Sequence, residues 1–196
     1  MSAIRVEALT GARLQAHLPD VARLRIEVFR AFPYLYDGDL DYEARYLRAF
    51  AASRDAVIVG AFDGDEVVGA STAAPLMGQT DEVTAPFRAR GEDLSRIFYF
   101  GESVLMAGYR GQGIGVRFFD LREAQARRCG ASGAAFCAVA RADDHPARPV
   151  DYVPLDAFWR KRGYAPVPGL ICRMDWREIG CAEETAKTMQ FWTKAL

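Results

Sequence analysis

Long apolar runs are missing from this sequence of 196 residues. No stretch approaches the roughly 20 apolar residues that a membrane-spanning helix needs. The first residues, Met1 to Glu7, also lack the apolar core of a signal peptide. We therefore expect a cytoplasmic protein without a membrane partner.

Cysteine and histidine are scarce as well. The chain has four cysteines and two histidines, and no two cysteines show the close spacing of a metal-binding pair. Without an export signal, cysteines are expected to be reduced and mostly buried. No Cys or Ser lies in a nucleophile motif, which favours direct transfer over a covalent enzyme intermediate. The sequence thus predicts neither a disulfide scaffold nor a metal site.

An excess of charge of either sign is also absent. The 25 basic and 26 acidic residues leave a net charge of −1, which argues against general binding to nucleic acid or to a membrane surface. With 51% apolar and 26% charged residues, the composition is that of an ordinary globular protein. The length allows one domain with a sizeable core, and we predict a single domain over residues 1–196.

What the sequence does contain is a glycine cluster between a strand pattern and a helix pattern. Residues 97–105 form an apolar, aromatic-rich run typical of a strand. Residues 113–129 show helical periodicity, and Gly130 ends it. Between them lie Gly111, Gly113 and Gly115. Such a unit directs free backbone N–H groups and the positive end of the helix to one point, which suits a phosphate.

The glycine spacing decides between phosphate-binding motifs. The dinucleotide fingerprint needs a final three-residue step that this loop lacks, and the Walker loop needs a lysine that is absent here. The loop reads Arg110-Gly111-Gln112-Gly113-Ile114-Gly115, or R-x-x-G-x-G. This pattern resembles the pyrophosphate loop of the GNAT superfamily of acyl-CoA-dependent N-acyltransferases. The preceding Leu105-x-x-x-Tyr109-Arg110-Gly111 is similar to the strand end of that family, with Ala107 in place of the usual proline. The alternative is a glycine turn that serves tight packing only.

The rest of the chain follows the order of elements in that family. We expect strands over 3–9, 97–105, 134–140 and 170–176, a hairpin over 56–76 around Asp63-Gly64, and helices over 14–32, near 46–50, over 113–129 and over 155–162. In the third of these helices, Arg122 and Glu123 are expected on the polar side. Residues 77–95 would form a loop or short helix, a lid over one mouth of the site. Residues 177–196 are predicted as a helical tail, whose Phe191 and Trp192 could serve a homodimer.

The resemblance implies a fold class and a cosubstrate. The fold would be α/β (α+β), a GNAT fold with a mixed, mostly antiparallel central sheet that is splayed at the cofactor site and has helices on both faces. Its core would span about residues 3–176. The cosubstrate would be acetyl-CoA. Backbone groups of Leu105 and Ala107 would meet its pantetheine arm, and the N–H groups of Arg110, Gly111, Gln112, Gly113, Ile114 and Gly115 its pyrophosphate. Trp159 would pack against the pantetheine or the core.

Transfer of an acyl group to an amine needs a base for the ammonium proton and an acid for the leaving thiolate. The resemblance places Glu102 where several family members have their base, among apolar neighbours that would partly desolvate it. The alternative is that Glu102 pairs with an arginine or faces solvent at a strand bulge. The family's acid is the tyrosine of F-Y-x-x-x-G-F. Here Trp159 stands at that position, and an indole cannot supply the proton. Tyr152 is the nearest candidate acid.

The acceptor is expected at the connection between the first two helices. Residues 34–43 combine carboxylates with aromatic rings, and Tyr34, Tyr36 and Asp37 are the candidate binding residues. Carboxylates and aromatic faces suit a cationic amine. Acidic residues at a helix start are also ordinary capping chemistry, so both interpretations stay open.

The sequence therefore predicts an N-acetyltransferase that moves an acetyl group from acetyl-CoA to a primary amine of a small molecule or peptide by direct attack. Its partners would be that amine and, in the family's common form, a second copy of the chain. The alternative is a catalytically weak GNAT-fold module that binds acyl-CoA as a sensor or interaction domain. Analogy of fold does not name the acceptor.

Overall fold

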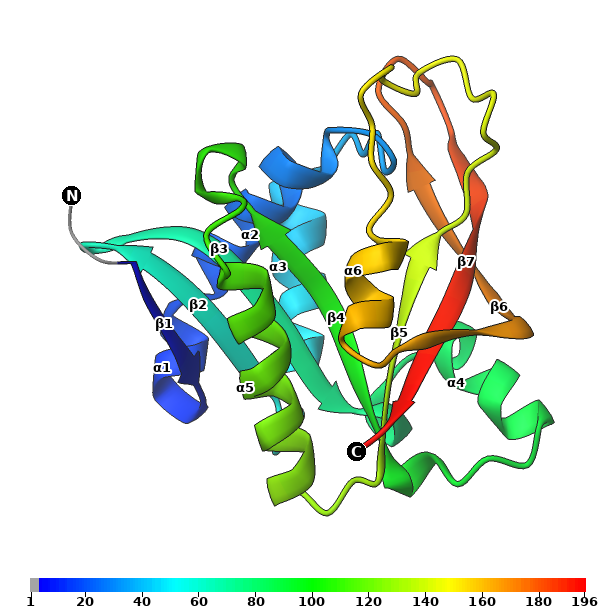
Figure 1. The fold of residues 1–196 in the computed structure, drawn as a ribbon. Coiled ribbons are helices and arrows are strands. Elements are labelled where there is room, and N and C mark those ends of the chain that lie inside the picture. Colours follow the sequence, from blue (N-terminus) through cyan, green and yellow to red (C-terminus); the bar gives the residue numbers. More distant parts are fainter. Residues whose placement is uncertain (1–3) are drawn as a thin grey trace.

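The computed structural model describes residues 4–196, which form one seven-stranded sheet in the order β1-β2-β3-β4-β5-β7-β6 (Figure 1). The strands are β1 (Arg5–Leu9), β2 (Val57–Asp63), β3 (Glu66–Pro75), β4 (Ile97–Leu105), β5 (Gly133–Val139), β6 (Ala165–Arg177) and β7 (Glu184–Ala195). Neighbouring strands are antiparallel except β4 and β5, which are parallel. Residue 3, which the predicted first strand included, lies outside the described residues.

Helices cover both faces of the sheet. One face packs against α5 (Ile114–Arg128) and α6 (Asp156–Lys161). The other packs against α1 (Gly11–Ala16), α2 (Leu18–Phe29) and α3 (Leu40–Ala51), with α4 (Asp81–Ala89) over the β6 side. Short 3₁₀ turns are η1 (Leu76–Gly78), η2 (Leu94–Arg96) and η3 (Ala107–Tyr109). The predicted fold class, a mostly antiparallel mixed sheet between helices, is confirmed.

The local sequence explains the central strands. β2 is an unbroken apolar run because it is buried on both faces. Val57 and Val59 belong to the core under α5, whereas Ile58 belongs to the core against α1–α3. Gly64, with φ of +61°, closes the turn to β3, as the Asp-Gly pair predicts. The predicted helix over 14–32 is divided at His17, and a proline occupies the first turn of α2, where its missing N–H costs nothing.

The sheet opens in its middle. β4 and β5 pair only from Ile97 to Tyr99, and beyond that point they diverge. β4 also carries one extra residue near Gly101 and Glu102, because its register to β3 shifts there. A Cβ on Gly101 would lie 2.5 Å from the Thr72 hydroxyl, so this bulge requires glycine. The same hydroxyl accepts the Glu102 N–H at 3.3 Å. The predicted splay is therefore present, and the bulge lies within it.

The predicted helical tail is wrong. Residues 184–195 form β7, which pairs with β5 on one side and β6 on the other. The segment around Met189 and Phe191 alternates with polar residues, which is the period of a strand and not of a helix. Phe191 is 0% exposed and Trp192 is 3% exposed, and they face the two opposite cores of the sheet. They are thus not available as a dimer surface.

Residues 77–95 hold the last two residues of η1, the helix α4 and most of η2. Among residues 4–196, no helix combines the length and the apolar character that crossing a membrane requires.

Candidate functional site

A cleft of about 1980 Å³ occupies the opening between β4 and β5 and reaches from the glycine loop to the α2–α3 connection. It brings together most of the residues that the sequence singled out. Its lining includes Glu102, Tyr152, Leu105, Arg110, Gly111, Gly113, Ile114, Gly115, Trp159, Tyr34, Tyr36 and Asp37. Ala107 and Gln112 are not part of the lining. Ala107 begins η3, and the Gln112 side chain turns back to the Gly108 carbonyl. From the predicted lid, Gln79, Thr80, Glu82 and Val83 also line the cleft.

The glycine loop presents bare backbone to this cleft. Gly111 and Gly113 have φ values of +76° and +79°, and Gly113 is the N-cap of α5 without a side-chain cap. The N–H groups of residues 111–115 find no acceptor within residues 4–196. A Cβ on Gly111 or Gly113 would meet no atom within 4 Å, so open space borders the loop. The first turn of α5 carries no acidic residue. These features fit a phosphate group, which unpaired N–H groups and a positive helix end attract.

Glu102 lies at the bulge with one oxygen paired and one free. Its Oε2 accepts from Arg25 Nη1 at 2.7 Å and from the Tyr46 hydroxyl at 3.4 Å. Its Oε1 is buried and has no hydrogen-bond partner within residues 4–196. The sequence left open whether Glu102 pairs with an arginine. It does so, but only through Oε2. Because buried polar atoms are nearly always satisfied, the free oxygen marks a place for a ligand or water.

Arg25 joins Glu102 to a second buried carboxylate, Glu43, to which it donates a short hydrogen bond. Glu43 is 0% exposed and also accepts from the Tyr36 hydroxyl at 2.8 Å. Burial alone lowers the pKa of Arg25, but the negative charges of Glu102 and Glu43 outweigh it and raise that pKa. Two carboxylates and one guanidinium leave this cluster with one net negative charge.

Sequence reasoning missed Arg25, and it placed Glu43 only among the carboxylates of the acceptor segment, without its pairing to Arg25. A signal was present, because both residues sit on the apolar stripe of their helices. Arg25 is four residues after Val21, and Glu43 is four residues before Leu47, and both of these apolar residues are fully buried. A charged residue at such a position is either paired or functional.

Tyr152 and Trp159 lie in the wall on the β5 side. The ring of Tyr152 packs edge-on against Phe32, with a centroid distance of 4.7 Å. Burial raises the pKa of Tyr152. Trp159 packs edge-on against Phe136 and Trp192 at 5.1 and 5.0 Å, so it is anchored in the core and shows only part of its ring to the cleft.

The acidic segment after α2 is largely engaged within the protein. Asp37 pairs with Arg177 at 3.0 Å and with Arg30 at 3.7 Å. Asp39 caps α3 by accepting the Tyr42 N–H at 2.9 Å, which is the capping interpretation. Glu102, whose side chain is 2% exposed, lines the cleft with one oxygen that has no donor among residues 4–196.

The prediction that Arg122 and Glu123 lie on the polar side of α5 is wrong. Arg122 is 1% exposed and lines the cleft. Its guanidinium donates to the Thr72 carbonyl at 3.4 Å and lies over the Phe100 ring, and burial lowers its pKa to about 10. Glu123 is also buried and pairs with Lys194 at 2.8 Å. The reason is tertiary: Arg122 faces the sheet and is enclosed by Thr72 of β3 and the Phe100 ring of β4, and Lys194 near the end of β7 reaches Glu123.

Comparison with known proteins agrees with this geometry. No family model matches the sequence, and no curated protein matches it. Solved structures do match over nearly the whole chain. A ribosomal-protein-alanine N-acetyltransferase of Brucella melitensis has 16% identity and a TM-score of 0.61, with 98% of this chain and 99% of that chain covered. A GNAT-family acetyltransferase of Staphylococcus aureus has 12% identity and a TM-score of 0.58, with 99% of each chain covered.

A third protein, from Salmonella typhimurium and assigned as an acetyltransferase, was solved with acetyl-CoA. It has 11% identity and a TM-score of 0.61, with 100% of this chain and 95% of that chain covered. At these identities the comparison establishes the fold. The chain has the fold of the GNAT acetyltransferases.

Proposed function

We propose that this protein is an N-acetyltransferase that transfers the acetyl group of acetyl-CoA to a primary amine of a small molecule or peptide. The observation that carries the proposal is the juxtaposition in one cleft of an anion-binding backbone loop and a buried carboxylate with a free oxygen. The fold, shared with a protein that binds acetyl-CoA, supports it.

The coenzyme would enter along β4 and α5. The N–H groups of residues 111–115 would hold its pyrophosphate, aided by the positive end of α5. Leu105, at the end of β4, would border the pantetheine arm, with Trp159 on the opposite wall. Beyond Tyr99, β4 no longer pairs with β5, so its backbone groups there can bind an extended arm.

The chemistry would be direct attack. The amine nitrogen forms a bond to the thioester carbonyl carbon, the carbon–sulfur bond breaks, and the coenzyme leaves as a thiolate. Oε1 of Glu102 would take the ammonium proton, directly or through one water. Tyr152 would return a proton to the thiolate, because its raised pKa keeps the phenol protonated at neutral pH.

A module that only binds acyl-CoA would need the loop but not a desolvated carboxylate with an unpaired oxygen. Such an oxygen costs about 1–3 kcal/mol when nothing binds it. Its presence favours catalysis over the binding role.

The test is thiol release from acetyl-CoA with a panel of primary amines, followed by mass spectrometry of the product. We expect amine-dependent thiol release that Glu102→Gln lowers strongly while acetyl-CoA still binds. Binding of acetyl-CoA with no transfer to any amine would instead establish the acyl-CoA-binding module.

A further inference from the structure

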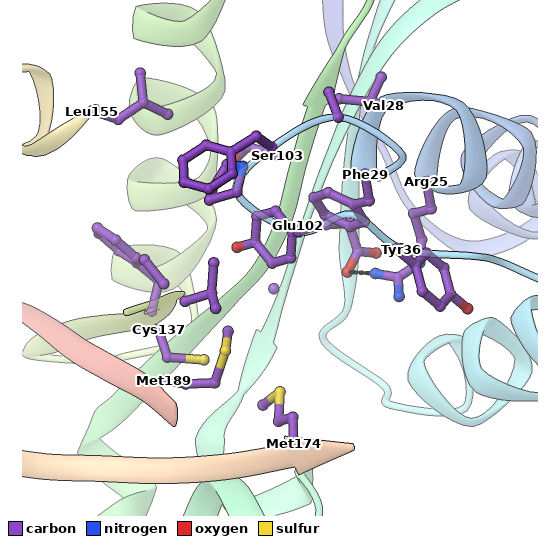
Figure 2. A pocket seen from close by; sticks show the side chains of 18 of the residues that line it. Arg25, Val28, Phe29, Tyr36, Glu102, Ser103, Cys137, Leu155, Met174 and Met189 are labelled. Atoms are coloured by element: carbon purple, nitrogen blue, oxygen red, sulfur yellow. Dashed lines mark hydrogen bonds and ion pairs between the residues drawn. The ribbon is translucent and has the colours of Figure 1, made fainter. Parts of the chain in front are cut away.

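Beside Glu102 lies a compartment of the cleft that we call the acceptor chamber. Its walls are Val28 and Phe29 of α2, Cys137 of β5, Met174 of β6 and Met189 of β7 (Figure 2). The two methionine side chains and the cysteine gather below Glu102 in this view, and the α2 residues lie above it. These five side chains are aromatic, aliphatic or sulfur-bearing, and the Glu102 carboxylate lies at their edge.

The charge at that edge suits one ammonium group. The cluster of Arg25, Glu43 and Glu102 carries one net negative charge, and Oε1 of Glu102 is the oxygen left without a donor among residues 4–196. A single ammonium group would donate a hydrogen bond to Oε1 and would also neutralise the negative charge of the cluster. A second ammonium group deeper in the chamber would meet apolar walls and lose its hydration without a partner.

The walls favour an apolar body behind that ammonium group. Met189 is 4% exposed and Met174 is half-buried, so both present thioethers that adapt to the shape of an apolar ligand. Thioether sulfur also makes favourable contacts with aromatic rings. A compact aliphatic or aromatic group fits this lining better than a hydroxylated one.

Residues 33–37 connect the end of α2 to the β6–β7 hairpin. Tyr36 forms an isolated antiparallel bridge with Glu178. The Asp37 N–H donates to the Arg177 carbonyl at 3.0 Å, and the Ile179 N–H donates to the Leu35 carbonyl at 2.8 Å. The backbone groups of the hairpin edge at 177–179 are thereby occupied.

Side chains also tie residues 33–34 to neighbouring segments. The Trp176 indole donates to the Tyr34 carbonyl at 2.9 Å, and Arg141 donates to the same carbonyl and to that of Pro33. Leu35 holds a left-handed backbone with φ of +53°, a conformation that persists only where its surroundings impose it. One mode of peptide binding adds a strand to a free sheet edge. At residues 177–179 the backbone edge beside the chamber is already paired.

We propose that the acceptor is a small primary monoamine with a compact apolar body, bound with its ammonium group on Oε1 of Glu102 and its body between Met174, Met189 and Phe29. The proposal rests on the acetyl transfer proposed above and names the acceptor class of the same site. Polyamines and peptide N-termini are the acceptors it excludes.

The experiment compares three acceptors with acetyl-CoA: 2-phenylethylamine, spermidine and a peptide that begins with alanine. We expect kcat/KM to be highest for 2-phenylethylamine. Met174→Gln places an amide against the apolar body and should raise the KM for this amine about tenfold. Met77→Gln is the matched control, because Met77 is 64% exposed and lies outside the cleft lining, and it should leave KM unchanged.

A second readout does not depend on turnover. Cys137 lines the chamber, whereas the exposed Cys129 and Cys181 lie outside the cleft lining. We expect 2-phenylethylamine to slow the alkylation of Cys137 by iodoacetamide and to leave the other two thiols unaffected, and we expect spermidine to slow none of them. Mass spectrometry of the alkylated peptides measures each rate.

The outcomes separate the two proposals. If acetyl-CoA does not bind, the acetyl-transfer function itself fails. If it binds and the peptide or spermidine is preferred, or if Met174→Gln and Met77→Gln behave alike, the acceptor class is overturned and acetyl transfer stands. Absence of both turnover and Cys137 protection with 2-phenylethylamine also overturns the acceptor class.

Discussion

The two ends of the cleft are built in different ways. The proposed coenzyme end is made of backbone N–H groups from one continuous stretch, residues 111–115. The acceptor end is made of side chains from α2, α3, β4, β5, β6 and β7, which meet only after folding. A site made of backbone needs glycines at fixed spacing and leaves a pattern in the sequence. A site made of distant side chains leaves no contiguous motif, only single unusual positions such as a charged residue on an apolar helix stripe.

The two ends also differ in the charge of the ligand that each would bind. The loop offers unpaired N–H groups at a helix N-terminus, which attract anions. The chamber edge carries one net negative charge on the cluster of Arg25, Glu43 and Glu102. This difference in charge suits a phosphate-bearing coenzyme at one end and a cationic amine at the other, as proposed above.

The largest expected effect is on turnover. Glu102→Gln keeps the shape of the side chain but removes the base, so kcat should fall by about 10²- to 10⁴-fold while the affinity for acetyl-CoA stays unchanged. Steady-state kinetics and a coenzyme titration measure the two quantities. Glu43→Gln is the matched control, because it also removes a carboxylate from Arg25 but does not line the cleft. Equal loss of kcat in both variants would assign Glu102 to structure alone.

Arg25→Met should have the largest effect on stability. It leaves the buried carboxylates of Glu43 and Glu102 without their cation, and breaking such a buried pair costs about 3–5 kcal/mol. Urea unfolding measures this loss. Arg23→Met, on the same helix, removes an exposed pair with Glu27 and one hydrogen bond to the Val67 carbonyl, and should cost only about 1–2 kcal/mol. Comparable losses for the two variants would contradict the role given to the buried cluster.

The coenzyme end is tested by Gly113→Ala. With φ of +79°, a side chain here strains the backbone by about 1–2 kcal/mol, and the added methyl group enters the space proposed for the pyrophosphate. Gly130→Ala, at the other end of α5 with φ of +77°, imposes similar strain away from the cleft. Both variants should lose similar stability, and only Gly113→Ala should lose acetyl-CoA affinity, by about tenfold or more.

The smallest expected effect is a change in the pH profile. Burial raises the pKa of Tyr152, so its phenol stays protonated until the pH exceeds the ordinary value of about 10. As an acid, Tyr152 would support activity below this raised pKa and lose that role as the pH rises through it. Tyr152→Phe should therefore lower kcat and remove the alkaline fall. An unchanged profile would leave thiolate protonation to water.

Much of the fold follows from local sequence. The Asp63-Gly64 turn between two β-branched runs predicted the β2–β3 hairpin, and the strand–glycine–helix unit predicted β4, the loop and α5. These features depend on neighbours in the chain, and the structure has each of them. The free N–H groups of the loop follow from the same local pattern.

Other features depend on partners far away in the chain. Residues 184–195 become a strand because β5 and β6 offer unpaired edges on both sides. Arg122 is buried because the centre of the sheet and neighbouring aromatic rings enclose it. The pairing of Arg25 with Glu102 joins residues 77 positions apart, and no local pattern reports it. The glycine before Glu102 was a usable signal, because a glycine within a strand indicates a bulge.

The most direct test of the account is calorimetric titration of acetyl-CoA into the wild-type protein and into Glu102→Gln and Gly113→Ala. We expect saturable binding of one acetyl-CoA per chain, equal affinity for Glu102→Gln and clearly weaker binding for Gly113→Ala. Binding of ATP but not of acetyl-CoA, or affinity unaffected by Gly113→Ala, would contradict the assignment of the glycine loop and with it the acetyl-transfer function.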